Sequence, residues 1–369
     1  MTIRVGSLVL ATDQGLGVLA RAFHAHGVIT DVLVVRHSSR PTHEEWYPGA
    51  TIVDARRVPG DMSVRRFCES VDVMLFLETP WDWSLIPFCR ERRIKTAIVP
   101  MYECMPSPLL YHPDLFICPS LLDLQYYPNG GRAQYMRDQT GIGKVESRGP
   151  RSMFIPVPVE VPWKQRNLQA KVFVHNAGHA GLKGRNGTRE LIEALQYVKS
   201  DAQIIIRSQD HQPLWERAIA EASSRVDVHY SSGTIRHESL YDEGDVFVWP
   251  HQFDGLSLPL NEARASGMVI MSTDRYPDNT WLPTEIVAND RGDVVNPLIP
   301  VKSYVKDQIG GCNEFDRAVI DPRSIAMKID QLYGAYTDAN SLTGLKWAED
   351  NSWERLKPEY ARALEELCE

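Results

Sequence analysis

Short runs of β-branched and aromatic residues alternate with amphipathic segments of helical length along the whole chain. In one such segment, Leu16, Leu19, Ala20 and Phe23 fall on a single helical face. This alternation is typical of parallel sheets with helices packed on both faces. In the first half, strands are predicted at residues 3–11, 32–36, 71–77, 96–99 and 115–119, and helices at 16–26 and 86–93.

The second half repeats the same alternation. Its strands are predicted at 171–175, 203–207, 226–230, 245–249 and 269–272, and its helices at 187–198, 213–223, 258–266 and 353–367. Between the halves stand Pro156, Pro158 and Pro162, which favour an extended chain and cannot lie inside a helix. The sequence therefore predicts an N-terminal α/β domain at 1–158, a hinge at 155–162, a second α/β domain at 165–345 and a C-terminal segment at 346–369.

Composition and charge narrow the class of protein. A chain of 369 residues, with 43% hydrophobic and 24% charged residues, is long enough for two globular domains. Its formal net charge of -8 argues against nonspecific coating of nucleic acid, which depends on clustered Lys and Arg. Residues 1–163 carry 17 Lys and Arg against 17 Asp and Glu, so the acidic excess lies in the remainder. A local basic surface remains compatible with these counts.

The cysteines and the apolar runs indicate a cellular compartment. The 6 cysteines include no C-x-x-C pair, so neither a zinc site nor a small disulfide framework is indicated. The start of the chain lacks a basic head followed by an apolar run, and the longest apolar stretches are as short as strands. We therefore expect a cytoplasmic protein without a transmembrane segment.

A first glycine-rich turn follows the first predicted strand and opens a helix. It contains Gly15 and Gly17, and such a turn lets backbone N–H groups face an anion. A third glycine is missing, and Arg36 and His37 stand where a dinucleotide site has an acidic residue. A nicotinamide dinucleotide is therefore disfavoured, and a tight turn without any ligand is the alternative interpretation.

A second glycine-rich loop, residues 176–188, again joins a strand to a helix. Its four glycines permit close backbone approach to a ligand, and Lys183 supplies the point charge that a diphosphate needs. Arg185 adds a second cation. The alternative interpretation is a solvated loop without a ligand.

A third motif places two carboxylates eight residues apart. Asp254 lies in a predicted loop and Glu262 in the helix that follows, with the helix start between them. Such an arrangement can hold the sugar, the diphosphate and the ribose of a sugar nucleotide. The alternative is a residue near the helix N-terminus and an exposed helical glutamate.

These motifs carry a resemblance to a known family. The segment from Asp245 through Asp254 and Glu262 to Gly267 resembles the E-x7-E region of retaining glycosyltransferases with the GT-B fold, in particular glycosyltransferase family 4. The loop of Lys183 resembles that family's phosphate-binding loop, and residues 154–160 resemble its interdomain linker. The resemblance implies two Rossmann-like doubly wound domains that face a cleft. It also implies that the C-terminal helix packs back on the first domain.

The resemblance also implies roles for individual residues. Glu262 would bind the ribose hydroxyls, Asp254 the hydroxyls of the sugar ring, and Lys183 the diphosphate. The remaining donor-binding residues implied are the amides of Gly255, Leu256, Ser257 and Leu258, the glycines Gly15 and Gly17 on the phosphate or sugar, and Arg207, Ser208, Gly233 and Thr234 beside the base.

Three positions depart from the family pattern. The first acid is Asp254 rather than a glutamate, which shortens its reach by one methylene. Ala177 stands where the family has a phosphate-binding arginine, and Arg185 or His179 is the substitute that we expect. Tyr102 and Glu103 stand in place of the active-site histidine, so Glu103 is assigned to the acceptor or sugar, with His112 as the neighbouring histidine.

The activity that follows from the resemblance is transfer of a sugar from a nucleotide diphosphate sugar, most simply a UDP-sugar, to an acceptor hydroxyl with retention at the anomeric carbon. No D-x-D triplet occurs, so we expect no metal site and no cofactor beyond the nucleotide sugar. The acceptor is left open between a saccharide or small molecule and a modified base in DNA, as for some viral enzymes. The sequence also leaves open a catalytically inactive protein that binds nucleotide sugars, and it does not define the oligomeric state.

Overall fold

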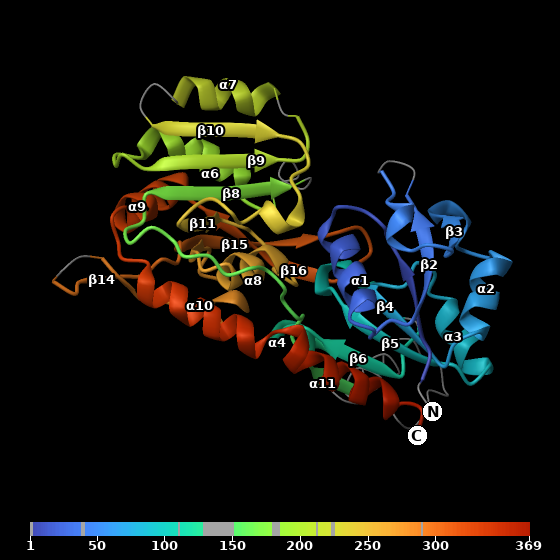
Figure 1. Cartoon of the computed structure of the whole chain (residues 1–369). Coiled ribbons are helices and arrows are strands. Elements are labelled where there is room, and N and C mark those ends of the chain that lie inside the picture. The colour runs from blue at the N-terminus through green and yellow to red at the C-terminus, as the bar shows by residue number, and fades with distance from the viewer. Residues whose placement is uncertain are drawn as a thin grey trace. The chain divides into compact units, whose positions relative to one another are not determined.

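The computed structural model describes residues 3–37, 41–109, 111–127, 151–178, 185–211, 213–222, 226–288 and 291–369. The chain divides into two compact units. The first unit contains Met1–Pro158, Gln308–Asn313 and Trp353–Glu369, and the second contains Val159–Asp307 and Glu314–Ser352. Figure 1 labels their elements.

The first unit is built on a seven-stranded parallel sheet. Its strands are β1 (Val5–Val9), β2 (Asp31–Arg36), β3 (Thr51–Asp54), β4 (Val73–Glu78), β5 (Lys95–Pro100), β6 (Leu115–Cys118) and β7 (Arg151–Phe154), in the order β3-β2-β1-β4-β5-β6-β7. The helices are α1 (Gly15–Ala25), α2 (Met62–Glu69), α3 (Leu85–Glu91), α4 (Leu121–Tyr126) and α11 (Trp353–Glu365). The order reverses between β1 and β4, as in doubly wound sheets.

The C-terminal helix α11 is part of the first unit because its aromatic side chains pack against α1. The ring of Phe23 lies 5.0 Å from the ring of Trp353 and 5.0 Å from that of Tyr360, edge to face in both cases. Tyr360 is fully buried and donates to the Pro156 carbonyl at 3.1 Å. These contacts hold the end of the chain on the first unit, beside the last residues before the second.

The second unit is built on a five-stranded parallel sheet. Its strands are β8 (Val172–Gly178), β9 (Gln203–Ser208), β10 (Asp227–Ser232), β11 (Val246–Trp249) and β12 (Val269–Ser272), in the order β10-β9-β8-β11-β12. Its helices are α6 (Thr188–Ala194), α7 (Pro213–Ala222), α8 (Leu258–Ala265), α9 (Pro322–Leu332) and α10 (Asp338–Asp350). Two sheets of parallel strands combined with helices confirm the predicted doubly wound α/β class.

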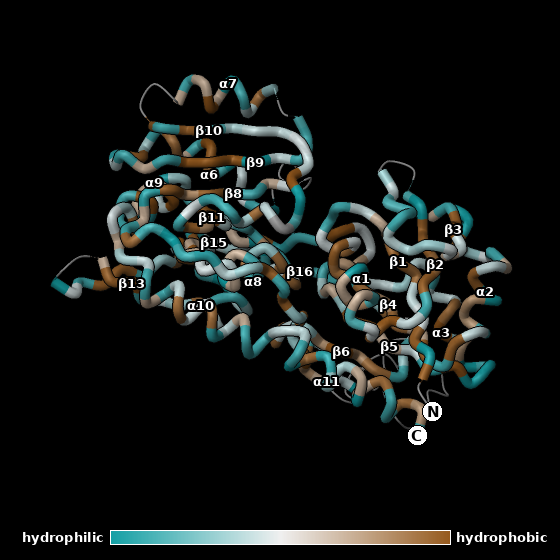
Figure 2. The backbone as a smooth tube through the Cα atoms, viewed as in Figure 1, coloured by the Kyte–Doolittle hydropathy of each residue, from teal (hydrophilic) through white to brown (hydrophobic). Residues whose placement is uncertain are grey.

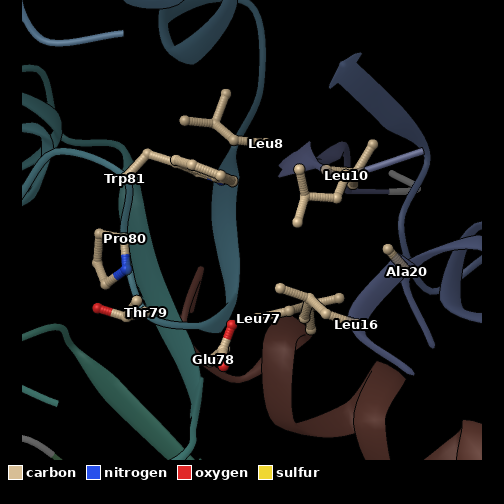
Figure 3. Close-up of a pocket in the computed structure, with 10 residues that line it drawn as sticks. Leu8, Leu10, Leu16, Ala20, Leu77, Glu78, Thr79, Pro80 and Trp81 are labelled. Atoms are coloured by element: carbon tan, nitrogen blue, oxygen red, sulfur yellow. The ribbon is translucent and has the colours of Figure 1, made fainter. Parts of the chain in front are cut away.

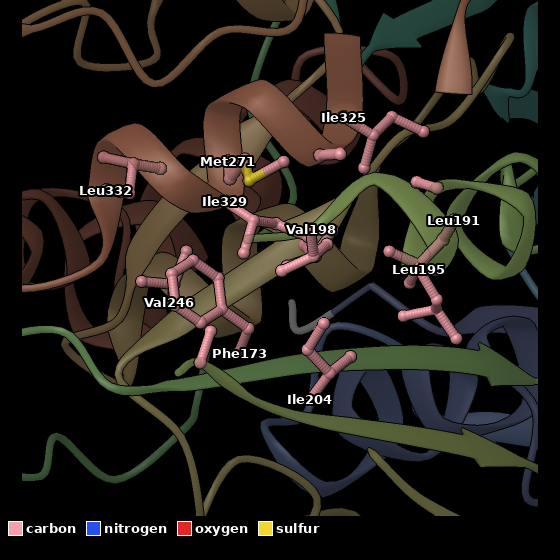
Figure 4. Close-up of a cluster of buried hydrophobic side chains, with 14 of the residues drawn as sticks. Phe173, Leu191, Leu195, Val198, Ile204, Val246, Met271, Ile325, Ile329 and Leu332 are labelled. Atoms are coloured by element: carbon pink, nitrogen blue, oxygen red, sulfur yellow. The ribbon is translucent and has the colours of Figure 1, made fainter. Parts of the chain in front are cut away.

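One hydrophobic core cluster of the second unit lies between its sheet and the helices α6 and α9. Phe173 and Ile204 from the sheet meet Leu191 of α6 and Ile329 of α9, and all four are fully buried (Figure 4). β8 and β9 each contain a run of three hydrophobic residues, Val172–Val174 and Ile204–Ile206 (Figure 2), as expected for strands covered on both faces. Burying each such side chain contributes about 1.5–3 kcal/mol.

Two antiparallel hairpins were not predicted. The first pairs β13 (Ile286–Val287) with β14 (Val294–Val295), and the second pairs β15 (Val301–Gln308) with β16 (Glu314–Ile320). Residues 308–313 at the tip of the second hairpin belong to the first unit. There Asn313 is fully buried, donates to the Tyr102 carbonyl at 2.9 Å and accepts from the Tyr126 hydroxyl at 2.6 Å. The tip therefore fixes the segment that follows β5.

No helix within the described part of the chain is both long enough and apolar enough to cross a membrane.

Candidate functional site

In the second unit, the described residues that were assigned to the nucleotide sugar lie at or after the carboxyl ends of the strands, or in the first turns of α8. β8 and β11 are paired only at Phe173↔Val246 and Val174↔Phe247, and they diverge beyond these residues. The strand order reverses between them. In open α/β sheets this is the position where ligands bind.

The loop after β8 is anchored at its C-terminal end. Lys183 and its neighbours from 179 to 184, including His179, lie outside the described residues. Arg185 is half-buried, and its carbonyl accepts a hydrogen bond from the Gln252 amide at 2.6 Å. Gly187 has a φ of +71°, and a Cβ there would overlap the Pro250 carbonyl oxygen. The chain before α6 is thus packed directly against the chain after β11.

A buried histidine supports this junction. His175 is fully buried, with Nε2 2.6 Å from the Thr188 hydroxyl and Nδ1 2.8 Å from the Val248 carbonyl. Thr188 Oγ1 also lies 2.9 Å from Asn186 Oδ1, and Asn186 Nδ2 donates to the Ala177 carbonyl at 2.6 Å. The network ties β8 and β11 to the first residue of α6.

The burial of His175 predicts a pH-dependent stability. Burial lowers the pKa of His175 to about 4, whereas an unfolded histidine titrates near pH 6.5, so acid protonates the unfolded chain first. The free energy of unfolding should therefore fall as pH drops from about 6.5 to about 4, by up to about 3 kcal/mol. Denaturant unfolding of the wild type and of His175→Gln at several pH values measures how much His175 contributes to this pH dependence. Identical pH slopes for the two proteins would contradict it.

The loop that carries Asp254 is hydrogen-bonded to a buried cluster of charged side chains. His251, Arg275 and Asp278 are all nearly inaccessible to solvent. Arg275 Nη1 donates to Asp278 Oδ2 at 2.6 Å and to the Asp254 carbonyl at 3.3 Å, and His251 Nε2 lies 2.9 Å from Asp278 Oδ2. Burial alone would raise the pKa of Asp278, but the His251 hydrogen bond and the Arg275 charge hold it below its usual range.

The backbone between Asp254 and α8 is tightly turned. The Asp254 carboxylate accepts a hydrogen bond from the Leu256 amide at 3.3 Å, and Ser257 has a φ of +49°, which is rare for a residue with a side chain. Gly255 and Ser257 are buried, whereas Asp254, Leu256 and Leu258 are half-buried. The two predicted acids are thus separated by a tight turn and about one turn of helix.

Glu262 is held by two side chains, His237 and Tyr241, that sequence analysis did not identify. Its Oε1 lies 2.9 Å from His237 Nε2, and its Oε2 accepts from the Tyr241 hydroxyl at 2.6 Å. Burial and the neighbouring carboxylate raise the pKa of Tyr241 well above its usual value, so the hydroxyl remains a donor. His237 and Tyr241 are 25 and 21 residues before Glu262 in sequence, and no spacing rule connects them.

The residues assigned to the base divide into two kinds. Arg207 is buried, pairs with Glu243 and donates to the Leu240 carbonyl at 2.8 Å, so it supports the turn that carries Tyr241. Ser208 is also buried. The Gly233 amide donates to the Ser208 carbonyl at 2.9 Å, and Gly233 and Thr234 are exposed. Only the last two are open to a ligand at the sheet edge in this arrangement.

In the first unit, the turn that contains Gly15 and Gly17 needs a glycine at position 17 for a steric reason. A Cβ on Gly17 would overlap the Thr12 carbonyl oxygen and lie 2.8 Å from the Thr12 nitrogen. This close approach favours the tight-turn interpretation of Gly17. Gly15 is exposed at the first residue of α1.

Glu103, which was assigned to the acceptor or sugar, lies in a buried turn of the first unit. Glu103 is fully buried in the turn after β5, near Asp123. Burial, followed by the nearby Glu103 charge, raises the pKa of Asp123 well above its usual value. The role of Glu103 toward the acceptor or sugar stays a prediction. The neighbouring His112 is half-buried, and its carbonyl accepts from Arg90 at 2.8 Å.

Solved structures with a similar fold come from several sugar-handling proteins. The pneumococcal O-GlcNAc transferase GtfA, in complex with UDP and GlcNAc, aligns with a TM-score of 0.55 and 19% identity over 82% of this chain and 59% of its own. HepE from Anabaena, in complex with UDP and glucose, aligns with a TM-score of 0.66 and 10% identity over 99% and 100% of the two chains. The chain has the GT-B fold. Sucrose-phosphate synthase from Thermosynechococcus elongatus shares it, with a TM-score of 0.60 and 12% identity over 99% of each chain.

The GT-B fold is established by structure alone, because no protein-family model and no curated protein matches the sequence. This chain spans about three fifths of the length of GtfA. Within the described residues, no three His, Cys, Asp or Glu side chains are grouped so as to hold a metal ion.

Proposed function

We propose that the protein is a retaining glycosyltransferase, similar to family 4, that transfers a sugar from a UDP-sugar to an acceptor hydroxyl. The observation that carries the proposal is the fixed carboxylate of Glu262, which is oriented by His237 and Tyr241 at the carboxyl edge of the second sheet. GtfA and HepE, which share the fold, contain UDP in their structures.

The geometry of Glu262 suits a ribose. A carboxylate offers about four acceptor positions, so two protein donors leave capacity for the hydroxyls of a ribose. Its side chain is 18% exposed, and both oxygens are held in place by protein contacts before any ligand arrives. Such preorganisation lowers the entropy cost of binding. Asp254, at the other end of the tight turn, is the acceptor for hydroxyls of the sugar.

In the proposed reaction, the acceptor oxygen forms a bond to the anomeric carbon while the bond from that carbon to the diphosphate oxygen breaks. The acceptor proton passes to the departing diphosphate oxygen, and UDP leaves. Lys183 and the amides at the start of α8 stabilise the negative charge that develops on the diphosphate. The protein thus contributes positioning and charge stabilisation, without a metal ion.

Replacing Glu262 with alanine should weaken UDP binding by about ten- to one-hundredfold, because hydrogen bonds to a charged group each contribute about 1.5–3 kcal/mol. Isothermal titration of the full-length protein with UDP measures the change. Glu262→Gln keeps the shape but removes the charge, and we expect an intermediate affinity.

The matched control is Glu221→Ala, which removes an exposed carboxylate from α7 in the same unit. It should leave the UDP affinity unchanged. Equal UDP affinities for the wild type and Glu262→Ala would rule out the assigned role of Glu262, and an absence of UDP binding by the wild type would overturn the proposed donor.

A further inference from the structure

A buried asparagine lies near the carboxyl end of β8, beyond the point where β8 and β11 stop pairing. Asn176 is only 8% exposed. Neither its Oδ1 nor its Nδ2 has a hydrogen-bond partner among the residues that the structure describes. Burying a carboxamide without partners destabilises a folded protein, and most buried polar side-chain atoms have at least one partner. A ligand that supplies both a donor and an acceptor would remove this cost.

The side chain of Asn176 lies on the face of the sheet that α8 covers. Side chains alternate along a strand, so Asn176 shares a face with Val174. Val174 packs in one buried cluster with Trp249 of β11 and with Leu260 in the first turn of α8. Asn176 is two residues closer to the carboxyl edge of the sheet, and it therefore lies toward the start of α8.

The start of α8 favours an anion. α8 begins after Ser257, whose side chain makes no capping hydrogen bond within the described part of the chain. A helix N-terminus attracts negative groups through its dipole and its backbone amides. The register of β8 on β9 shifts between Asn176 and Gly178, so the strand becomes irregular directly after the asparagine. Such irregularities are frequent beside ligand sites, where they redirect side chains.

The corresponding edge of the first unit has a different lining. A pocket of about 270 Å³ opens there at the carboxyl ends of β1 and β4. Eight of its ten lining residues have apolar side chains, among them Leu10 and Trp81 (Figure 3). Such walls suit an apolar part of a ligand, whereas the carboxamide of Asn176 suits a part that forms hydrogen bonds. The polar diphosphate therefore fits the edge of the second unit.

We propose that Asn176 is a further donor-binding residue: its Nδ2 donates to a diphosphate oxygen of the nucleotide sugar, and its Oδ1 accepts from a hydroxyl group of the sugar. This inference rests on the proposed function. The two atoms of the carboxamide need one acceptor and one donor, and a sugar joined to a diphosphate presents both. The negative charge of the diphosphate strengthens the first of these bonds. Asn176 thus recognises the junction between diphosphate and sugar, whereas Glu262 binds the ribose.

The test measures affinity and stability in one variant. Asn176→Leu keeps the size of the side chain but removes both polar atoms. We expect UDP-glucose to bind about ten- to one-hundredfold more weakly. The ligand-free variant should nevertheless melt at a temperature at least about 2 °C higher than the wild type, because the unpartnered carboxamide is gone. Calorimetric titration and thermal unfolding of the full-length protein measure the two effects. An unchanged affinity, or a lower melting temperature as expected for a purely structural role, would overturn the proposal.

A series of ligands locates the contact. Asn176→Leu should weaken the binding of inorganic pyrophosphate but not that of uridine, whereas Glu262→Ala should weaken the binding of uridine but not that of pyrophosphate. The loss for UDP-glucose in Asn176→Leu should exceed the loss for UDP, which has no sugar hydroxyl beyond the diphosphate. Gln331→Ala removes an exposed carboxamide from α9 and is the control, with affinities equal to those of the wild type. Equal losses for uridine and UDP-glucose would overturn the assigned contact.

Titrations of the wild type separate this inference from the proposed function. Binding of UDP-glucose that Asn176→Leu leaves intact would keep the proposed donor and overturn the role of Asn176. Binding of pyrophosphate but not of UDP, with the pyrophosphate affinity reduced in Asn176→Leu, would keep the phosphate contact and overturn the proposed donor. A wild type that binds none of these ligands would overturn both.

Discussion

Replacing Gly187 with alanine should destabilise the second unit by more than about 4 kcal/mol, a loss large enough to unfold many domains. Two effects add at this position. The φ of +71° is a conformation that costs a residue with a Cβ about 1–2 kcal/mol. The new Cβ would also overlap the Pro250 carbonyl oxygen and lie 2.6 Å from its carbon, and neither atom belongs to a side chain that can rotate away.

The control for Gly187→Ala is Gly334→Ala in the same unit. Gly334 has a φ of +80°, but a Cβ there meets nothing within 4 Å, so it isolates the cost of the backbone conformation. We expect a loss of about 1–2 kcal/mol for Gly334→Ala. Denaturant unfolding of both variants measures the difference. Equal losses would show that the chain before α6 is not packed against Pro250 as the structure has it.

Parts of the fold with strong local patterns were predictable from sequence. The predicted strands at 203–207 and 269–272 correspond to β9 (Gln203–Ser208) and β12 (Val269–Ser272), because each is a continuous apolar run bounded by turns. The edge strand β3 was missed, since it has only four residues and begins exposed. β15 was missed because nearly all of its side chains are exposed, so it has no apolar face to detect.

The candidate site was predictable only where it follows directly from the order of elements. A turn between a strand and the next helix must lie at the carboxyl edge of a parallel sheet, so Asp254 and Arg185 were placed correctly at that edge. The partners that fix the site come from distant turns. Tyr241 reaches Glu262 across 21 residues and Asp278 reaches His251 across 27, and no periodic pattern encodes either contact.

The burial of Glu103 could not be predicted for a related reason. Its place after a strand end was correct, because the turn Tyr102–Cys104 follows β5 directly. Sequence could not show that the tip of a hairpin from residues 308–313 packs on this turn, with Asn313 bound to the Tyr102 carbonyl. Long-range packing therefore determined the burial of Glu103, whereas local order determined its position along the chain.

Replacing Arg275 with alanine should cost about 3–5 kcal/mol of stability, because it leaves the Asp278 carboxylate buried without its cation. Both side chains are at most 3% exposed, so water cannot solvate the remaining charge. The Asp254 carbonyl also loses a donor, and the loop that carries the proposed sugar-binding acid is released. We therefore expect weaker UDP-sugar binding even where the variant remains folded. Denaturant unfolding and titration with UDP-glucose measure the two effects.

Two further variants test whether burial of an ion pair, rather than pairing itself, sets the cost of removing one charge. Lys306 and Asp316 form an exposed pair at 3.0 Å in the β15–β16 hairpin, so Lys306→Ala should cost no more than about 1 kcal/mol.

The double variant Arg275→Met with Asp278→Leu removes both buried charges and fills their space with apolar atoms. It should be more stable than Arg275→Ala, since an uncompensated charge is more costly than an apolar pair. A double variant that is less stable than Arg275→Ala would show that Asp278 contributes more through its contact with His251 than its buried charge costs.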